Sequence, residues 1–351
     1  EKQTYAPFTP KEKDFYTTDY FTNYALEWLD EYAGSEKPFF LYLAYNAPHD
    51  PLMAWPEDIA KYEGKYRDGY EAIRRARYEK QRSLGLIDDR YRLSEATFRK
   101  WESLSDEERA VEERKMAVYA AMIDRMDQNI GRVIRKLKEQ GKFDDTLIIF
   151  VSDNGASAEV VELKDSYGEI GSMTCWTSLG PDWANVANTP LRYFKNYSYQ
   201  GGISAPMIAT WPNGLRNPGR LSDFTGHFID IMATFVDLAG APYPEEYKGR
   251  RIVPYEGVSL LPVIRDEKPV REKPLFWEWQ HGRAVRDGKW KLVKHGSDTP
   301  WSLFDMEADP SETQDLAASH PETVTRMNAM FEAWKKRVSI TKAHPHLKKN
   351  L

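Results

Sequence analysis

The chain has 351 residues, 41% of them hydrophobic, so it is long enough to bury a sizeable core and is expected to be globular. Its formal net charge is −5 with both signs interspersed, which argues against nucleic acids or anionic membranes as partners. A single cysteine, Cys175, allows neither an internal disulfide framework nor a thiolate zinc site. No apolar run approaches the roughly 20 residues of a membrane span, and residues 1–10 do not resemble an export signal.

The first half of the chain alternates helical and strand patterns. Helices are expected over residues 17–34 and 115–141, and the apolar runs at 38–46 and 146–151 have the pattern of strands buried on both faces. This order is typical of an α/β fold with a mixed, largely parallel sheet flanked by helices. In the first helix, the side chains expected to face the core are Phe21, Tyr24, Trp28 and Tyr32.

A charge-rich stretch interrupts this order. Residues 52–113 carry helix formers but no obvious buried strand, so we interpret them as a helical insertion or lid. A third short strand at residues 206–211 and a helix at 228–240 follow. The α/β catalytic unit is therefore expected to span residues 1–255.

The pattern changes after the α/β unit. Asp287-Gly288 is a type I′ hairpin signal between two short strands, and Pro321 follows Ser319 at the expected start of a last helix. Residues 256–351 are therefore predicted to form a C-terminal subdomain with a small antiparallel sheet and one helix. Its strands are expected at residues 275–279, 283–286 and 289–293.

Two polar loops follow the buried strands, at the place where open α/β sheets collect their ligands. In the first loop, prolines stiffen the backbone around His49, whose imidazolium would suit an anionic ligand. In the second loop, Asp153 and Asn154 offer the oxygen ligands that calcium or magnesium prefers. Each loop alone also fits an ordinary surface turn that binds nothing.

A third element consists of residues 188–195 followed by Gly201-Gly202. Paired glycines let the backbone approach a ligand or another strand closely, and Lys195 just upstream offers a point charge for an oxyanion. A lone lysine is usually solvated, so this element alone also indicates little. The ordered occurrence of all three elements favours one shared site over three unrelated loops.

Together these motifs resemble the type I sulfatases, the formylglycine-dependent, arylsulfatase-like enzymes of the alkaline-phosphatase-like superfamily. The resemblance rests on Ala-Pro-His-x-Pro, Asp-Asn-Gly, Asn-Thr-Pro-x-Arg-x-x-Lys and Gly-Gly-x-x-x-Pro, in that order. It implies that Asp153 and Asn154 bind calcium, or alternatively magnesium. It also implies that His49 binds the sulfate or the bridging ester oxygen, and that Lys195 binds the sulfate and helps the leaving group. The implied substrate is an aryl or carbohydrate sulfate ester, and the implied location is periplasmic or secreted.

One part of the family pattern is absent. The family's Asp-Asp pair and its Cys-x-Pro-Ser-Arg motif, whose Cys or Ser becomes formylglycine, have no counterpart, and Cys175 lies in Thr-Cys-Trp-Thr-Ser instead. We therefore expect the chain to match the C-terminal part of a sulfatase and to be inactive alone, with formylglycine supplied by a segment that it lacks. It could be a fragment, one chain of an enzyme with an N-terminal companion chain, or a degenerate homologue.

Two other functions stay open at this point. One is a phosphodiester or phosphonate ester hydrolase of the same superfamily, and the other is a non-catalytic protein that binds a sulfated ligand. For substrate contacts, Trp183, Asn185 and Asn188 lie close enough before Lys195 to line its pocket. His281 could reach the same cleft from the C-terminal subdomain. Ordinary packing is the alternative for all four side chains.

Overall fold

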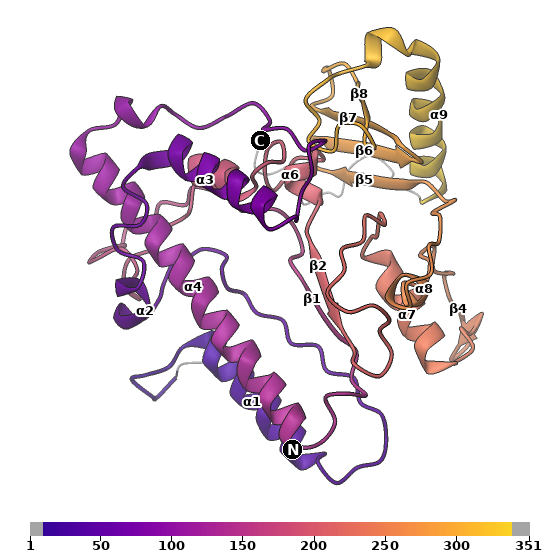
Figure 1. Ribbon diagram of the computed structural model, residues 1–351, viewed down its shortest axis with the longest axis horizontal. Coiled ribbons are helices and arrows are strands. Elements are labelled where there is room, and N and C mark those ends of the chain that lie inside the picture. Colours follow the sequence, from indigo (N-terminus) through magenta and orange to yellow (C-terminus); the bar gives the residue numbers. More distant parts are fainter. Residues whose placement is uncertain (1–9, 339–351) are drawn as a thin grey trace.

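A computed structural model describes residues 10–338, and Figure 1 shows a helical part, a middle part with the paired strands β1 and β2, and a C-terminal part built on a sheet. The helical part consists of α1 (Thr17–Glu31), α2 (Pro56–Ala60), α3 (Gly69–Ser83), η1 (Trp101–Ser103) and α4 (Asp106–Glu139). The middle part consists of β1 (Ile148–Val151), α5 (Pro181–Ala187), α6 (Gln200–Ile203), β2 (Met207–Thr210), α7 (Ile229–Ala239), β3 (Glu246–Tyr247), β4 (Arg250–Arg251) and α8 (Leu261–Ile264). The C-terminal part consists of β5 (Leu275–Trp279), β6 (Gly282–Asp287), β7 (Trp290–His295), β8 (Ser302–Asp305), η2 (Ala317–Ser319) and α9 (Pro321–Arg337).

Helices α1 and α4 lie side by side in Figure 1. The order of their ion pairs shows that they run in the same direction: Asp19 pairs with Arg125, and Asp30 pairs with Lys136 further along both helices. The two predicted helices are therefore present, but the predicted core face of α1 is wrong. Small side chains allow α1 to approach α4 closely, and the larger aromatic rings lie around the outside. The buried residues are Thr18, Thr22, Ala25 and Leu29, whereas Phe21, Tyr24 and Tyr32 are exposed and Trp28 is half-buried.

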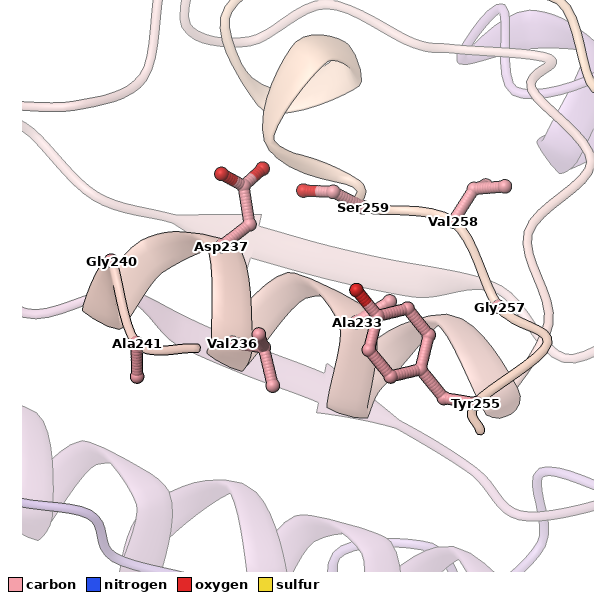
Figure 2. Close-up of a pocket in the computed structure, with 9 residues that line it drawn as sticks. All are labelled: Ala233, Val236, Asp237, Gly240, Ala241, Tyr255, Gly257, Val258 and Ser259. Atoms are coloured by element: carbon pink, nitrogen blue, oxygen red, sulfur yellow. The ribbon is translucent and has the colours of Figure 1, made fainter. Parts of the chain in front are cut away.

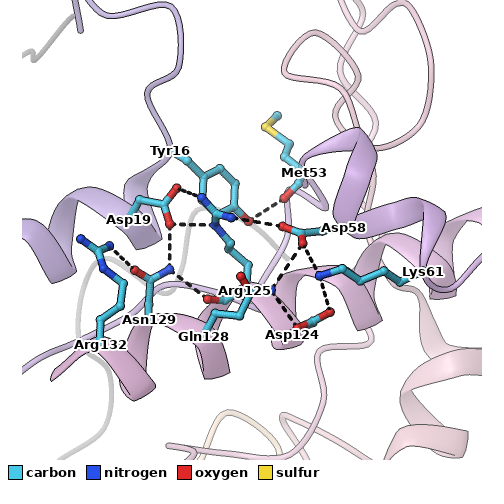
Figure 3. A network of polar contacts seen from close by, with 10 residues as sticks. All are labelled: Tyr16, Asp19, Met53, Asp58, Lys61, Asp124, Arg125, Gln128, Asn129 and Arg132. Carbon is cyan, nitrogen blue, oxygen red and sulfur yellow. Dashed lines mark hydrogen bonds and ion pairs between the residues drawn. The ribbon is translucent and has the colours of Figure 1, made fainter. Parts of the chain in front are cut away.

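A network of charged side chains joins α1, α2 and α4 (Figure 3). The Asp19 carboxylate accepts hydrogen bonds from Arg125 Nε at 2.8 Å and Nη2 at 2.7 Å, and from Asn129 Nδ2 at 2.7 Å. In α2, the buried Asp58 carboxylate lies 2.7 Å from Lys61 Nζ and 3.7 Å from Arg125 Nη1. Arg125 thus bridges two carboxylates on two different helices, and removing it would take away the ion pair of Asp19, whereas Asp58 would keep Lys61.

Residues 52–113 contain α2, α3, η1 and the first turns of α4, joined by segments without regular structure. Helix α4 begins at a capping box in which Ser105 Oγ accepts from Glu108 N at 3.2 Å and the Glu108 carboxylate accepts from Ser105 N at 2.7 Å. The aromatic rings of this region pack around Trp183 of α5, so the stretch covers that helix. Its proposed role as an insertion or lid stays a prediction.

The strands predicted at residues 146–151 and 206–211 are present as β1 and β2, and they pair antiparallel, from Ile148 opposite Thr210 to Val151 opposite Met207. The sequence predicted a mixed, largely parallel sheet without assigning partners to these two strands, and this pair is antiparallel. The strand predicted at residues 38–46 is not among the strands found within residues 10–338, and Phe40 is exposed. An apolar run indicates that its own side chains could be buried, but it does not identify the neighbouring strand that would pair with it.

The C-terminal sheet has the strand order β5-β6-β7-β8, with every neighbouring pair antiparallel. Three of its strands and helix α9 match the predicted subdomain, whereas β8 was not predicted. The predicted type I′ turn between β6 and β7 is wrong. A type I′ turn needs a positive φ at both of its loop residues, but here only Gly288 has one, of 55°. One face of the sheet packs on α9, and the other packs on Tyr193, Tyr197 and Tyr199 of the middle part.

Candidate anion and metal site

Two of the predicted site residues, His49 and Lys195, meet in the structure although 146 residues separate them in the sequence. Lys195 Nζ lies 2.8 Å from His49 Nε2, within hydrogen-bonding distance. An ammonium group can only donate, so Nε2 carries the lone pair and Nδ1 carries the proton in this arrangement. A cation and a neutral imidazole side by side form a site with an affinity for an anionic group.

The orientation of the His49 ring is set by the next residue, Asp50. Nδ1 lies 3.0 Å from the Asp50 carbonyl oxygen, which accepts the hydrogen bond, and 2.9 Å from the carboxylate oxygen Oδ1. The Asp50 side chain is buried, and its other oxygen accepts from Ser178 Oγ at 3.0 Å. The buried carboxylate therefore favours the Nδ1 proton by its charge, much as a carboxylate orients the histidine of a catalytic triad. Asp50 was part of the quoted motif but was not predicted to act.

Glu159 is a second acidic residue of the site that the sequence analysis missed. Its carboxylate oxygens lie 3.3 Å from Lys195 Nζ and 3.9 Å from His49 Nε2, and its side chain is half-exposed. The segment around it has neither periodicity nor a motif, so no sequence signal pointed to it. The Glu159 carboxylate thus lies beside Lys195 Nζ, in the position where an anionic ligand would bind.

The loops that carry the predicted site residues are joined by backbone hydrogen bonds. Gly155 N donates to Gly202 O at 3.1 Å, and Lys195 N donates to Ala156 O at 3.1 Å. A side chain at Gly155 would not fit, because a Cβ atom there would lie 1.7 Å from the carbonyl oxygen of Gly201. The glycines therefore allow the close approach of the two loops that the sequence predicted.

Asp153 and Asn154 follow strand β1 directly, and Asn154 Nδ2 donates to Asp153 Oδ1 at 2.7 Å. This contact leaves Asp153 Oδ2 and Asn154 Oδ1 as oxygen donors in a loop exposed to solvent. Their donor chemistry fits calcium or magnesium, but two oxygens are few beside the roughly six to eight that calcium takes.

A second group of possible metal ligands consists of His49, Asp50 and Glu159, whose ligand atoms lie within 4.8 Å of one another. Lys195 Nζ contacts two of these three residues directly. A positive charge at that position repels a metal ion and attracts an anion. The arrangement therefore fits an anion better than a cation.

Helix α5 carries Trp183 and Asn185, and both side chains are fully buried, so the prediction that they contact a substrate is wrong. Trp183 Nε1 donates to Glu112 O at 2.9 Å, and the Asn185 amide oxygen accepts from Thr97 N at 3.2 Å. Both partners belong to residues 52–113, which pack over α5. The sequence could not show this cover, since the contacts join segments about 70 to 90 residues apart.

Asn188 is also structural, because both ends of its amide are engaged. Oδ1 accepts from Ala156 N at 3.0 Å, and Nδ2 donates to Tyr193 O at 3.0 Å. Asn188 therefore links the loop after β1 to the segment that leads to Lys195, and its contact with a substrate stays a prediction. His281 is exposed at the turn between β5 and β6, and its predicted role stays open.

A buried ion pair ties the C-terminal sheet to α6. Lys291 of β7 is 1% exposed and Glu312 is 0% exposed, and Lys291 Nζ lies 2.6 Å from Glu312 Oε1. Gln200, the first residue of α6, donates its N–H to Glu312 at 2.7 Å and accepts from Lys291 Nζ at 3.0 Å. Burial lowers the pKa of Lys291 and raises the pKa of Glu312, in both cases against the attraction of the partner.

A separate hollow lies along helix α7 (Figure 2). It is lined by small and apolar residues of α7 and of residues 255–259, with Asp237, Tyr255 and Ser259 as its polar side chains. Asp237 is the charged group among these lining residues, and no basic side chain accompanies it there. The hollow therefore lacks the charge that binds an anionic ester.

Comparisons with known proteins identify the family of this chain. A model of the sulfatase family matches residues 1–241, and a model described as N-sulphoglucosamine sulphohydrolase, C-terminal, matches residues 191–337. The chain belongs to the sulfatase family. An uncharacterized sulfatase of Schizosaccharomyces pombe is 35% identical over 344 residues, covering 92% of this chain and 61% of that protein. An arylsulfatase of Klebsiella aerogenes is 34% identical over 263 residues, covering 71% of this chain and 56% of that protein. This sulfatase chain thus spans less than two thirds of the length of either relative.

Solved structures give the same fold. The crystal structure of Ps i-CgsB in complex with k-i-k-neocarrahexaose matches with a TM-score of 0.63 and 25% identity, over 93% of this chain and 56% of that one. A phosphonate monoester hydrolase of Agrobacterium radiobacter matches with a TM-score of 0.56 and 19% identity, over 94% and 62% of the two chains, which shows the fold alone. These neighbours confirm the alkaline-phosphatase-like α/β fold class. Within residues 10–338, no helix is both long and apolar enough to cross a membrane.

Proposed function

We propose that this sulfatase chain binds the sulfate group of a sulfate ester and takes part in its hydrolysis. The contact between Lys195 Nζ and His49 Nε2 carries the proposal, because it places a cation and an oriented imidazole at one point of the surface. Family membership supports sulfate as the anion. The aryl or carbohydrate nature of the ester rests on the family resemblance.

In this proposal Lys195 binds sulfate oxygens through its charge, and the sulfate takes the place of the Glu159 carboxylate beside Nζ. When Nε2 also carries a proton, the His49 imidazolium donates it to the bridging ester oxygen as the S–O bond breaks, while Asp50 holds the proton on Nδ1. Both side chains face charge that grows on oxygen as the S–O bond breaks, where fixed charges lower the barrier most.

Calcium and formylglycine belong to the proposal as expectations from the family. Asp153 and Asn154 supply two oxygen donors of the type that calcium takes, and a bound calcium ion would draw negative charge from the sulfate oxygens. The side chains of this chain that meet at Lys195 bind and orient the ester, and a formylglycine nucleophile would come from elsewhere. An N-terminal companion chain and a periplasmic or secreted location also stay predictions.

The test is turnover of 4-nitrophenyl sulfate by the full-length protein with Lys195→Ala or His49→Ala. Each replacement should lower kcat by about 10² to 10³ and change KM less, by analogy with loss of one oxyanion-hole donor. Lys336→Ala is a matched control, because Lys336 is exposed at the end of α9, and it should leave kcat unchanged.

Two results would contradict the proposal. Near-parental kcat in both variants, with unchanged melting temperatures, would remove both residues from the reaction. A kcat/KM for a phosphonate monoester well above that for the sulfate ester would instead favour phosphonate hydrolysis.

A further inference from the structure

One large aromatic side chain near the site is exposed. Trp279 ends strand β5 and is 59% exposed, and its indole N–H donates to Asn196 Oδ1 at 3.0 Å. An exposed indole with a fixed N–H has a restricted orientation, so it can offer a flat apolar face without much loss of side-chain entropy on binding.

The hydrogen bond joins Trp279 to the residue next to Lys195. Consecutive Cα atoms are about 3.8 Å apart, so Asn196 sits directly beside the lysine that contacts His49. Asn196 has a positive φ of 78°, a turn conformation that asparagine tolerates better than most residues. The anion-binding group and the fixed indole are therefore held by neighbouring residues of one turn.

The sheet itself leaves room for this turn. Trp279, Gly282 and His295 lie opposite one another on β5, β6 and β7, in one row across the sheet. A Cβ atom at Gly282 would lie 2.7 Å from Ser198 Oγ and 3.2 Å from Asn196 O, so the segment after Lys195 crosses the sheet at the glycine.

The other end of the row is also aromatic. The ring of Tyr197 stacks on His295 with 4.1 Å between the ring centroids, and His281 lies 5.9 Å from His295. The exposed turn of His281 thus borders the same row as Trp279. Flat rings and imidazoles next to an anion site suit a ligand that has an uncharged ring attached to its sulfate.

We propose that Trp279, held by Asn196 and bordered by His281, is a ring-binding subsite next to Lys195 that selects a sulfated saccharide over a compact sulfate ester. The subsite rests on the proposed function, because the sulfate at Lys195 places the sugar ring beside the indole. The charge of Lys195 then provides affinity for any sulfate ester, and Trp279 provides the preference for a ring.

Calorimetric binding to the full-length protein tests this subsite with three probes: methyl sulfate, a sulfated carrageenan hexasaccharide and the same hexasaccharide without sulfate. Trp279→Leu should weaken binding of the sulfated hexasaccharide between about threefold and tenfold, as expected for one lost aromatic contact, and should leave methyl sulfate unchanged. Trp279→Phe keeps a ring and should stay close to the parent. Tyr247→Ala, an equally exposed aromatic on β3, is the matched control and should change nothing.

The outcomes separate the subsite from the proposed function. If Lys195→Ala leaves the affinity for every probe unchanged while Trp279→Leu still weakens both hexasaccharides, the anion site is wrong and the ring subsite stands. If Trp279→Leu behaves like Tyr247→Ala, or if the parent binds methyl sulfate but neither hexasaccharide, the ring subsite is wrong. Asn196→Gly should reproduce part of the Trp279→Leu loss, because glycine keeps the backbone conformation but cannot hold the indole.

Discussion

Replacing Lys291 by methionine should strongly destabilise the chain. Methionine fills a volume similar to that of lysine, so the main change is loss of the charge that lies 2.6 Å from Glu312 Oε1. The Glu312 carboxylate then stays fully buried, compensated by the N–H of Gln200 and the more distant charge of Arg192. Breaking a buried ion pair from one side typically costs about 3 to 5 kcal/mol.

The double variant Lys291→Met with Glu312→Leu separates two contributions to the free energy of unfolding: the cost of leaving one buried charge uncompensated and the net contribution of the intact ion pair. Because burial of both charges is itself unfavourable, replacing both by apolar residues should recover most of the loss. The free energy of unfolding would be measured by urea denaturation of parent, single and double variants. A single-variant loss below about 1 kcal/mol, or a double variant no better than the single one, would contradict the reasoning.

Two further predictions concern the helical part. Trp183→Ala should lower the free energy of unfolding by about 3 to 5 kcal/mol, since removing the buried indole leaves a cavity. A variant that loses substrate affinity but keeps the urea denaturation curve of the parent would show instead that Trp183 lines a binding pocket. Burial alone would raise the pKa of Asp19, but hydrogen bonds from Arg125 and Asn129 lower it. The stabilisation from Asp19 is therefore present above the unfolded pKa of about 3.9 and is lost as the pH falls through the lower folded pKa. The stability gap between the parent and Asp19→Asn, followed by urea denaturation from pH 7 downward, should close in acid, and a gap independent of pH would contradict this.

Local patterns in the sequence predicted most of the elements. Helices α4, α7 and α9 and strands β5 to β7 were found because periodicity and turn residues act over a few positions. The short strand β8 was missed because Trp301 and Pro300 next to it gave no alternating pattern. The wrong core face of α1 has a different cause. Its orientation depends on the ion pair between Asp19 and Arg125, which joins positions 106 residues apart.

The site was predictable in part. His49 and Lys195 stood in motifs at the ends of apolar runs, and the structure brings their side chains together. Asp50 could have been found by the same reasoning, since it lies between His49 and a proline. Glu159 could not, because it approaches Lys195 through a loop with no regular pattern.

The same limit explains the error at α5. The stretch with Trp183 precedes Lys195 in the sequence, and sequence proximity was taken as a sign of a shared pocket. In the structure the helix turns its aromatic side towards Tyr70 of α3 and Trp101 of η1, so the indole fills the core. Proximity along the chain does not tell which way a short helix faces.

The backbone bonds between the loop after β1 and the segment at Lys195 have a thermodynamic consequence. Gly155 binds Gly202, and Lys195 binds Ala156, through main-chain atoms only, so neither loop can become ordered without restricting the other. A cation held at Asp153 would then reduce the conformational entropy that an anion at Lys195 still has to remove. By reciprocity, the anion would strengthen binding of the cation by the same factor, in addition to any direct attraction between the two ligands.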